Sequence, residues 1–196
     1  MKTIHKQLYL FSHILIVALL SCISCKSDYQ RMEDNELASG ETFNELFLGL
    51  ELGMEKKTFY EKCWKMNQEG ILLNGPTELS IEYKVEMPSG LPTKMRFYPK
   101  FDQDKIYLMP ADYSYDGWAP WNEDLAVEKL RADVVALYEQ WYGDGFIEVN
   151  SEDGSQVVFV KMDGNRRVRI YKKNLSTVRA EIVDLKIQKQ LEEYPS

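Results

Sequence analysis

Apolar and polar residues recur along the chain with two different periods, which predict helices and strands in a repeated order. One helix is predicted over about Glu55–Glu69, because it is followed by Gly70, a residue type common just past a helix C-terminus. A second helix is predicted between Asn122, as its N-terminal cap, and Gly143, as its closing residue. The apolar residues of the second helix recur every three or four positions, at Val127, Leu130, Val134, Leu137, Tyr138 and Trp141.

Strand-like segments follow each predicted helix. After the first helix they are Leu79–Met87, Thr93–Tyr98 and Lys105–Met109, and after the second they are Phe146–Val149, Gln156–Met162, Arg166–Lys172 and Ser176–Leu185. Apolar and charged residues alternate strictly over Ile81–Met87, as in a strand with one face on a core and the other in water. Asp153-Gly154 and Asp163-Gly164 predict two hairpin turns, the second of type I′.

This order of elements predicts an α+β fold. Strands do not alternate singly with helices, which argues against a doubly wound parallel sheet. We therefore expect tandem helix-plus-antiparallel-sheet halves, residues 43–112 and 113–196, with the helices packed on one face of the sheet. The two halves share little sequence, so an internal duplication stays an open question.

The first 21 residues have the composition of a secretory signal peptide. Lys2 and Lys6 form a positive region before the apolar run Leu8–Leu20. That run has 13 residues. A bilayer core needs about 20 residues to be crossed, so a cleaved signal is favoured over the alternative of an uncleaved membrane anchor.

The cysteine that follows this segment predicts a lipid anchor. Leu19-Leu20-Ser21-Cys22 resembles the lipobox of bacterial lipoproteins, which implies lipidation of Cys22, with Cys25 as the runner-up and an ordinary cleaved signal as the alternative. Two or more acyl chains give stable anchoring. Residues 22–42 are mostly polar, so we expect a flexible tether there. The expected location is the bacterial cell envelope, as an outer-membrane lipoprotein that is periplasmic or surface-exposed.

Charge and histidine content restrict the chemistry that the chain can perform. It has 24 Lys and Arg against 31 Asp and Glu, a net charge of -7, which argues against a nucleic-acid binder. Both histidines, His5 and His13, lie in the predicted signal peptide, so the mature protein would contain none. That excludes Ser-His-Asp and Cys-His nucleophile systems, histidine zinc sites and histidine-bound haem.

Two further candidate sites are interpreted as structural. Cys63 has no histidine partner and lies on an apolar helix face with Phe59 and Met66, so it is interpreted as a buried structural cysteine. Asp102-Gln103-Asp104 is similar to the start of a calcium loop, but the required Gly and final Glu do not follow, so it predicts a turn. We expect no catalytic residue, no metal and no cofactor.

Four aromatic residues lie close together before the second helix, in a stretch that also contains a glycine and a proline: Tyr113, Tyr115, Trp118 and Trp121. Aromatic rings on a loop between rigid elements offer much contact area at low entropic cost, which predicts a binding site for a sugar or a protein partner. In the alternative interpretation, Trp118 and Trp121 pack under the second helix as a staple that fixes its entry angle.

Basic residues cluster at Arg166–Arg169 and at Lys172-Lys173. At strand spacing Arg167, Arg169 and Lys173 share one face, and the apolar residues between them share the other. We interpret this face as a solvated sheet face, with a docking surface for an acidic partner as the alternative.

The segment Leu48–Met54, followed by Glu55–Phe59, resembles the opening of modules in the BamE/SmpA lipoproteins and in beta-lactamase-inhibitor-like (BLIP-like) proteins. In those families an apolar pair, Gly-Met and a polar triplet lead into the helix of a small helix-plus-antiparallel-sheet module. The resemblance covers residues 48–66 and implies this fold. Modules of these families mostly bind other proteins, but their binding residues do not align with this sequence. The signal and the aromatic stretch also resemble those of Bacteroidetes-type lipoproteins.

These features together predict a lipid-anchored envelope protein with a non-catalytic binding role. The expected partners are a protein or a glycan at the envelope, and the lipid bilayer through the N-terminal acyl anchor, without nucleic acid. One alternative is a carboxylate-dependent glycan hydrolase, which needs only two suitably spaced acidic residues. The other alternative is a purely structural envelope protein.

Overall fold

The computed structural model describes residues 27–77, 79–151 and 153–193. It comprises two units, residues 1–35 and 36–196, and the second contains the sheet and the helices that cover it. Four α-helices and one short 3-10 helix are described: α2 (Asp28–Ser39), α3 (Lys56–Gln68), η1 (Glu123–Leu125), α4 (Val127–Tyr142) and α5 (Leu185–Glu193).

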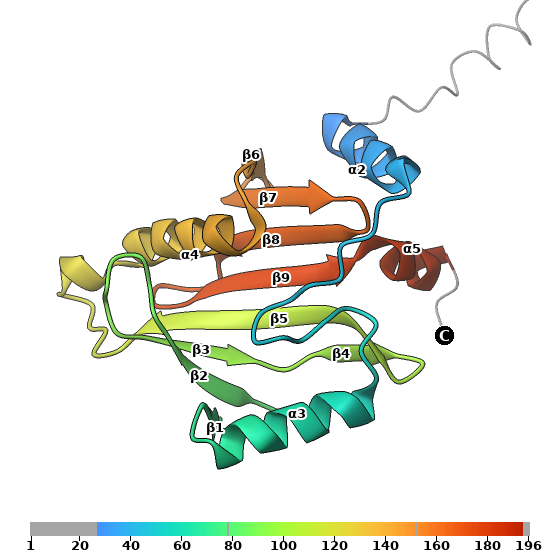
Figure 1. Ribbon diagram of the computed structural model, residues 1–196. Coiled ribbons are helices and arrows are strands. Elements are labelled where there is room, and N and C mark those ends of the chain that lie inside the picture. The colour runs from blue at the N-terminus through green and yellow to red at the C-terminus, as the bar shows by residue number, and fades with distance from the viewer. Residues whose placement is uncertain (1–26, 78, 152, 194–196) are drawn as a thin grey trace, which may run out of the picture. The chain divides into compact units, whose positions relative to one another are not determined.

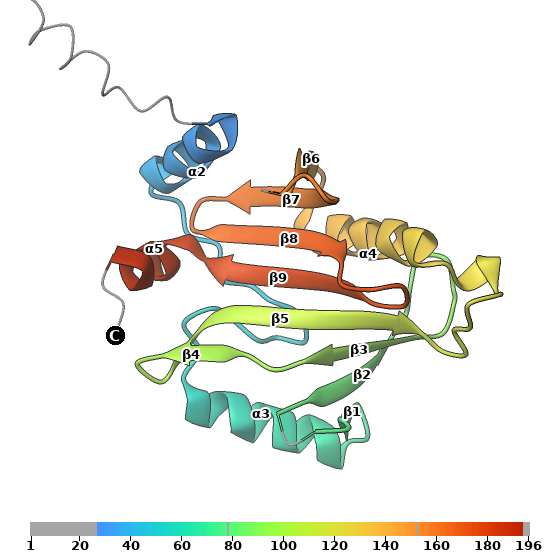
Figure 2. The same ribbon diagram turned by 180° about the vertical axis from the view of Figure 1, so that it is seen from behind.

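One antiparallel sheet of nine strands forms the centre of the second unit (Figures 1 and 2). Its strands are β1 (Leu72–Asn74), β2 (Ile81–Val85), β3 (Thr93–Phe97), β4 (Lys100–Asp102), β5 (Lys105–Tyr115), β6 (Ile147–Asn150), β7 (Val157–Asp163), β8 (Arg166–Lys172) and β9 (Val178–Asp184). Their order is β1-β2-β3-β5-β9-β8-β7-β6, and β4 pairs with the start of β5. The predicted α+β class with an antiparallel sheet is confirmed.

The two series of elements meet where β5 pairs with β9. Residues 105–115 of β5 are continuous, so the boundary predicted between residues 112 and 113 lies within a strand. On one face of this junction Ala111 lies opposite Ala180 and Tyr113 lies opposite Val178, all of them buried. Both series therefore contribute to one hydrophobic core.

Helix α4 packs on this core face against β8, β9 and β5, and Figure 1 shows it in front of β8. Its residues Leu130, Val134, Leu137 and Tyr138 are at most 3% exposed, which confirms the predicted helical stripe. Burying one such side chain stabilises the fold by about 1.5–3 kcal/mol. Helix α3 contributes Phe59 and Cys63 to the same core, and α5 follows directly from β9 at the end of the sheet. Cys63 is a buried free cysteine, as predicted.

Residues 43–52 form an irregular hairpin that closes one end of the core. Its turn uses positive φ angles at Leu48 and Gly49, and its buried residues are Leu46, Phe47, Leu50 and Leu52. The turn between β7 and β8 holds this hairpin. Asn165 Oδ1 accepts a hydrogen bond from Phe43 N at 2.7 Å, and Arg166 donates to Glu45 O at 3.0 Å.

The flexible tether predicted over residues 22–42 contains a helix, because α2 spans Asp28–Ser39. Two reciprocal hydrogen bonds mark its start. Ser27 N donates to Gln30 Oε1 at 3.0 Å, and Gln30 N donates to Ser27 Oγ at 3.1 Å. This is a capping box, which stabilises a helix N-terminus even where apolar residues are few. The capping-box sequence Ser-x-x-Gln is present, but the polar composition of the segment led to the prediction of a flexible tether.

The start of the second predicted helix is also corrected. Asn122 caps η1 rather than α4, since its Oδ1 accepts from Asp124 N at 3.1 Å. The chain is then extended at Ala126, and α4 begins at Val127. A single polar cap followed by acidic residues is compatible with either kind of helix, so the sequence does not separate them.

Two of the predicted turns lie where they were expected, with different details. Gln103 and Asp104 both have positive φ in the two-residue connection between β4 and β5, which confirms the turn predicted there. Between β7 and β8 the loop residues are Gly164 and Asn165, and of these Gly164 has positive φ. A type I′ turn needs positive φ at both positions, so the predicted type is wrong.

Candidate binding groove

The structure separates the four aromatic residues that the sequence groups together. Tyr113 and Tyr115 belong to β5 and point into the core, where they are 0% and 4% exposed. Tyr113 donates a hydrogen bond to the hydroxyl of Tyr138 at 3.2 Å, and Tyr115 donates to Asp133 at 2.5 Å. Through these hydrogen bonds both tyrosines hold α4 against the sheet. Neither lies on the surface that a ligand would contact.

Trp118 lies after the end of β5 and lines an open groove, which we call the Trp118 groove. Its volume is about 590 Å³. The groove lies between the stretch that leads into α4, the loop before β7 and the loop between β8 and β9. Its lining includes Trp118, Pro120, Val127, Gln156, Asn174 and Leu175. Small-molecule sites in proteins span about 300–1,000 Å³, so the groove is within that range.

Two large apolar side chains stand out in solvent at this end of the molecule. Trp121 is 85% exposed and Leu175 is 78% exposed. Trp121 therefore does not pack under α4, and the staple interpretation is wrong for this residue. Trp118 is half-buried beside Ala126 and Val127 in the groove wall. Of the four predicted site residues, Trp118 lines the groove, and Trp121 is in the same connection three residues later.

Hydrogen bonds within two loops hold the groove wall in place. Asn174 Oδ1 accepts from Ser176 N at 2.9 Å, and Lys173 N donates to Thr177 O at 2.9 Å. The loop before β7 is tied by Asp153, whose Oδ1 accepts from Ser155 N at 3.0 Å. Hydrogen bonds from Ser151 and Ser155 lower the pKa of Asp153 to about 2. The Asp153 carboxylate thus ties both Ser151 and Ser155 into the loop.

Amide side chains give the groove hydrogen-bond donors of fixed orientation. In both Asn122 and Asn174 the amide oxygen accepts a backbone N–H of the same loop. An amide has its donor NH₂ on the other side from its oxygen, so this contact fixes which end is presented. Within the described part of the chain neither NH₂ group has a hydrogen-bond partner. Both are suited to donate to a ligand oxygen.

One ion pair lies in the lining of the groove. Lys172 Nζ lies 2.8 Å from Glu128 Oε1 and joins the end of β8 to the first turn of α4. The hydrogen bond from Lys172 lowers the pKa of Glu128 below its usual range. A glycosidase acid needs the opposite, a raised pKa that keeps its proton at neutral pH. Glu128 is therefore suited to binding rather than to proton donation.

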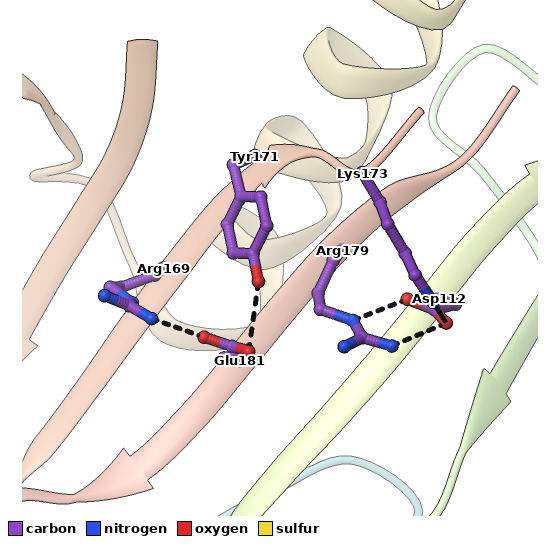
Figure 3. Close-up of polar contacts among 6 residues, drawn as sticks. All are labelled: Asp112, Arg169, Tyr171, Lys173, Arg179 and Glu181. Atoms are coloured by element: carbon purple, nitrogen blue, oxygen red, sulfur yellow. Dashed lines mark hydrogen bonds and ion pairs between the residues drawn. The ribbon is translucent and has the colours of Figure 1, made fainter. Parts of the chain in front are cut away.

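The sheet face opposite α4 carries a second polar cluster, drawn in Figure 3. Arg169 donates to Glu181 at 2.7 Å, and Tyr171 donates to the same carboxylate at 3.1 Å. Lys173 lies 2.8 Å from Asp112, so it shares this face with Arg169 as predicted. These side chains are partly exposed, and their charges are paired across β5, β9 and β8.

The solvated interpretation does not hold for Arg167, and Arg166, the residue before it, is also buried. Arg167 is 7% exposed, and it donates to Gln188 of α5 at 2.7 Å. Arg166 is 3% exposed and lies over the ring of Tyr142, with 4.3 Å from Cζ to the ring centroid. Their burial depends on α5 and on the hairpin of residues 43–52, neither of which the local pattern of β8 reveals.

In the described ranges no three or more His, Cys, Asp or Glu residues gather in a way that could hold a metal ion. In the same ranges no helix has both the length and the apolar character to span a bilayer. Cys22 and Cys25, the predicted lipidation residues, lie outside the described residues. Comparison with models of protein families, with curated proteins and with solved structures finds no match to this chain.

Proposed function

We propose that the protein is a non-catalytic binding protein of the bacterial cell envelope that holds a neutral glycan in the Trp118 groove. The observation that carries the proposal is the half-buried Trp118 ring in the wall of an open groove whose loops are fixed by hydrogen bonds. A fixed aromatic ring gives an apolar sugar face a large contact area at low entropic cost. The amide groups of Asn122 and Asn174 supply donors for hydroxyl oxygens.

Charge supports a neutral ligand. The cation of the groove, Lys172, is engaged by Glu128, and Glu123 adds a further acidic residue to the lining. A strongly anionic ligand would meet like charge there. The lowered pKa of Glu128 favours binding over the alternative of a carboxylate-dependent hydrolase.

Binding of the purified full-length protein to a glycan array tests this function. Trp118→Ala is expected to weaken binding to the preferred glycan by at least about tenfold, as for other buried aromatic anchors. Ile147→Ala removes an exposed apolar side chain of β6, outside both the Trp118 groove and α3, and is the control, with unchanged glycan binding. Equal binding by wild type and by folded Trp118→Ala would refute the glycan site.

A protein ligand is the second candidate, and two observations favour it. Trp121 and Leu175 are exposed apolar side chains of the kind that fill a partner's pocket. The resemblance of residues 48–66 to BamE/SmpA and BLIP-like modules implies protein binding as well. Pull-down from the native envelope, with wild type and with Trp118→Ala as bait, separates the two candidates. If the ligand is a protein, the wild type captures it, Trp118→Ala does not, and the glycan array shows no binding.

We propose an N-terminal lipid on Cys22, with Cys25 as the runner-up, as the means by which the protein is held at the outer membrane. Mass spectrometry of the mature N-terminal peptide tests this directly. Cys22→Ala is expected to release the protein into the soluble fraction, and Cys25→Ala is the matched control. An unmodified Cys22 together with an unmodified Cys25 would exclude the anchor.

A further inference from the structure

Helix α3 buries few of its side chains for its length. Of its 13 residues, Phe59 and Cys63 are buried. Trp64 is 67% exposed and Tyr60 is 44% exposed. At 3.6 residues per turn, Trp64 lies about 140° around the helix axis from Phe59, so its ring projects away from the core. Trp64 therefore marks a second apolar side of α3, and no element of the described chain covers that side.

The apolar surface continues from α3 onto the neighbouring edge of the sheet. Trp64 and Tyr60 line a shallow hollow of about 300 Å³, with Leu73 of β1 and Ile81 of β2 on its other side. Leu73 is 43% exposed, and nearby in the chain Leu79 is 66% exposed. Exposed apolar side chains that are contiguous, rather than scattered singly, mark interaction sites.

The charges beside Trp64 follow a regular order. Lys57, Glu61, Lys65 and Glu69 alternate in sign at intervals of four residues. Within the helix they form two exposed pairs, Lys57–Glu61 at 3.9 Å and Lys65–Glu69 at 4.0 Å. All four side chains are at least 49% exposed. Residue 63 is the midpoint of this row, and charges of opposite sign lie at equal distances on its two sides: Lys57 with Glu69, and Glu61 with Lys65.

From this charge order we infer that the α3 surface, defined as Tyr60, Trp64, Leu73 and the four flanking charges, pairs with the same surface of a second copy of this chain. When two copies of α3 cross antiparallel about a two-fold axis level with residue 63, Lys57 of one copy lies opposite Glu69 of the other. Glu61 then lies opposite Lys65. All four cross-pairs join opposite charges around the two tryptophans, whereas a parallel pairing puts like charges together.

Charge also distinguishes a second copy from a bilayer as the occupant. Helices that lie on membranes are rich in Lys and Arg on their polar side and attract anionic lipids. The row on α3 has as many acids as bases, and the other two lysines of the helix are engaged elsewhere, Lys62 with Gly49 O at 2.6 Å and Lys56 over the Phe101 ring. The α3 surface therefore gives little net attraction to an anionic membrane. The same balance is self-complementary, which is what a two-fold interface requires.

Sedimentation of the full-length protein tests the pairing, in density-matched detergent with a reducing agent that excludes disulfides. The wild type is expected to be dimeric from micromolar to sub-millimolar concentration. Trp64→Ala is expected to weaken the dimer by at least about tenfold. Trp121→Ala, which removes an exposed tryptophan outside the α3 surface, is expected to leave the dimer unchanged. A wild type that is monomeric throughout this range overturns the inference.

A charge exchange tests the orientation. Lys57→Glu with Lys65→Glu makes the row entirely acidic, and Glu61→Lys with Glu69→Lys makes it entirely basic. Each double variant alone is expected to be monomeric, with circular dichroism confirming the fold, and an equimolar mixture is expected to form a heterodimer. A mixture that stays monomeric overturns the antiparallel pairing, and so does a double variant that dimerises as tightly as the wild type. Vesicle binding that requires Trp64 while the protein stays monomeric would assign the surface to lipid instead.

Discussion

The carboxylate of Asp112 accepts two hydrogen bonds from the guanidinium of Arg179, at 2.7 and 2.8 Å, directly across the junction of β5 with β9 (Figure 3). The two residues are register partners in the sheet. Their side chains are 25% and 28% exposed, so solvent screens the pair less than a fully exposed one. The contact joins the two series of elements on the face that α4 does not cover.

Asp112→Asn is expected to lower the free energy of unfolding at neutral pH by about 1–2 kcal/mol, because charge-assisted bidentate contacts are among the stronger hydrogen bonds. Asp124→Asn is the matched control. Its ion pair with Lys129 is 3.0 Å long but 89% exposed on the acidic side, so its removal changes stability little. Urea unfolding of both variants measures the difference, and equal losses would contradict this account.

The same pair predicts how acid affects the fold. Burial alone would raise the pKa of Asp112, but hydrogen bonds from Arg179 and Lys173 outweigh it and hold the pKa below the usual 3.8. A lowered pKa in the folded state adds stability above pH 3.8 that is lost as the pH falls through the folded value. Between neutral pH and pH 2, unfolding should therefore depend less steeply on pH in Asp112→Asn than in the wild type. Parallel curves would show that Asp112 does not contribute.

The turn between β7 and β8 is expected to tolerate no side chain at Gly164. This residue has φ +52°, and a Cβ there would lie 2.5 Å from the carbonyl oxygen of Glu41. Gly164→Ala must then displace backbone, and we expect a loss of about 2–4 kcal/mol. Gly154→Ala has similar φ, +67°, but nothing within 4 Å of the added carbon, so about 1 kcal/mol is expected. Thermal unfolding compares the two, and equal shifts would mean that contact with Glu41 is not important.

The sequence predicts those strands whose pattern of residues is complete within one short segment, and β5 is an exception. The predicted strand ends at Met109, whereas β5 continues through Pro110, which lacks the N–H that a central strand uses. In the structure β4 pairs with β5 up to Leu108, and β3 pairs with it from Ala111 onward. Pro110 therefore lies in the gap between two partner strands on that side, and on the other side of β5 it is the register partner of Glu181 in β9. A gap between partners is a tertiary feature that local sequence does not contain.

Tyr113 and Tyr115 lie in this continuation of β5 and not in the loop predicted before the second helix. Beyond Pro110 the sequence alternates Asp112, Tyr113, Ser114 and Tyr115, which is the two-residue period of a strand with its tyrosines inward. That signal was available and would have placed both rings in the core. The Trp118 groove is different, because its lining comes from three connections whose proximity is set by the strand order. No local pattern indicates that Trp118 and Leu175 line the same groove.

Tyr113→Phe is expected to separate a core role from a binding role. Removing the hydroxyl loses the 3.2 Å hydrogen bond to Tyr138 in a fully buried site, at a cost of about 1 kcal/mol of stability. Ligand affinity should stay at the wild-type value, since the ring is 0% exposed. Calorimetric unfolding and binding to the ligand of the Trp118 groove are measured on the same preparation. Weakened binding by a folded Tyr113→Phe protein would mean that Tyr113 takes part in binding.

Cys63 is expected to be chemically inert while the protein is folded. Burial raises the pKa of its thiol from 9.0 to about 11, which leaves about a hundredfold less thiolate at neutral pH. Since the thiolate is the reactive species, alkylation should be at least about a hundredfold slower in the native protein than in urea. Mass spectrometry of the Cys63 peptide after timed treatment with iodoacetamide measures the rate for this cysteine apart from Cys22 and Cys25. Comparable rates in the folded and unfolded protein would show that α3 leaves the core readily.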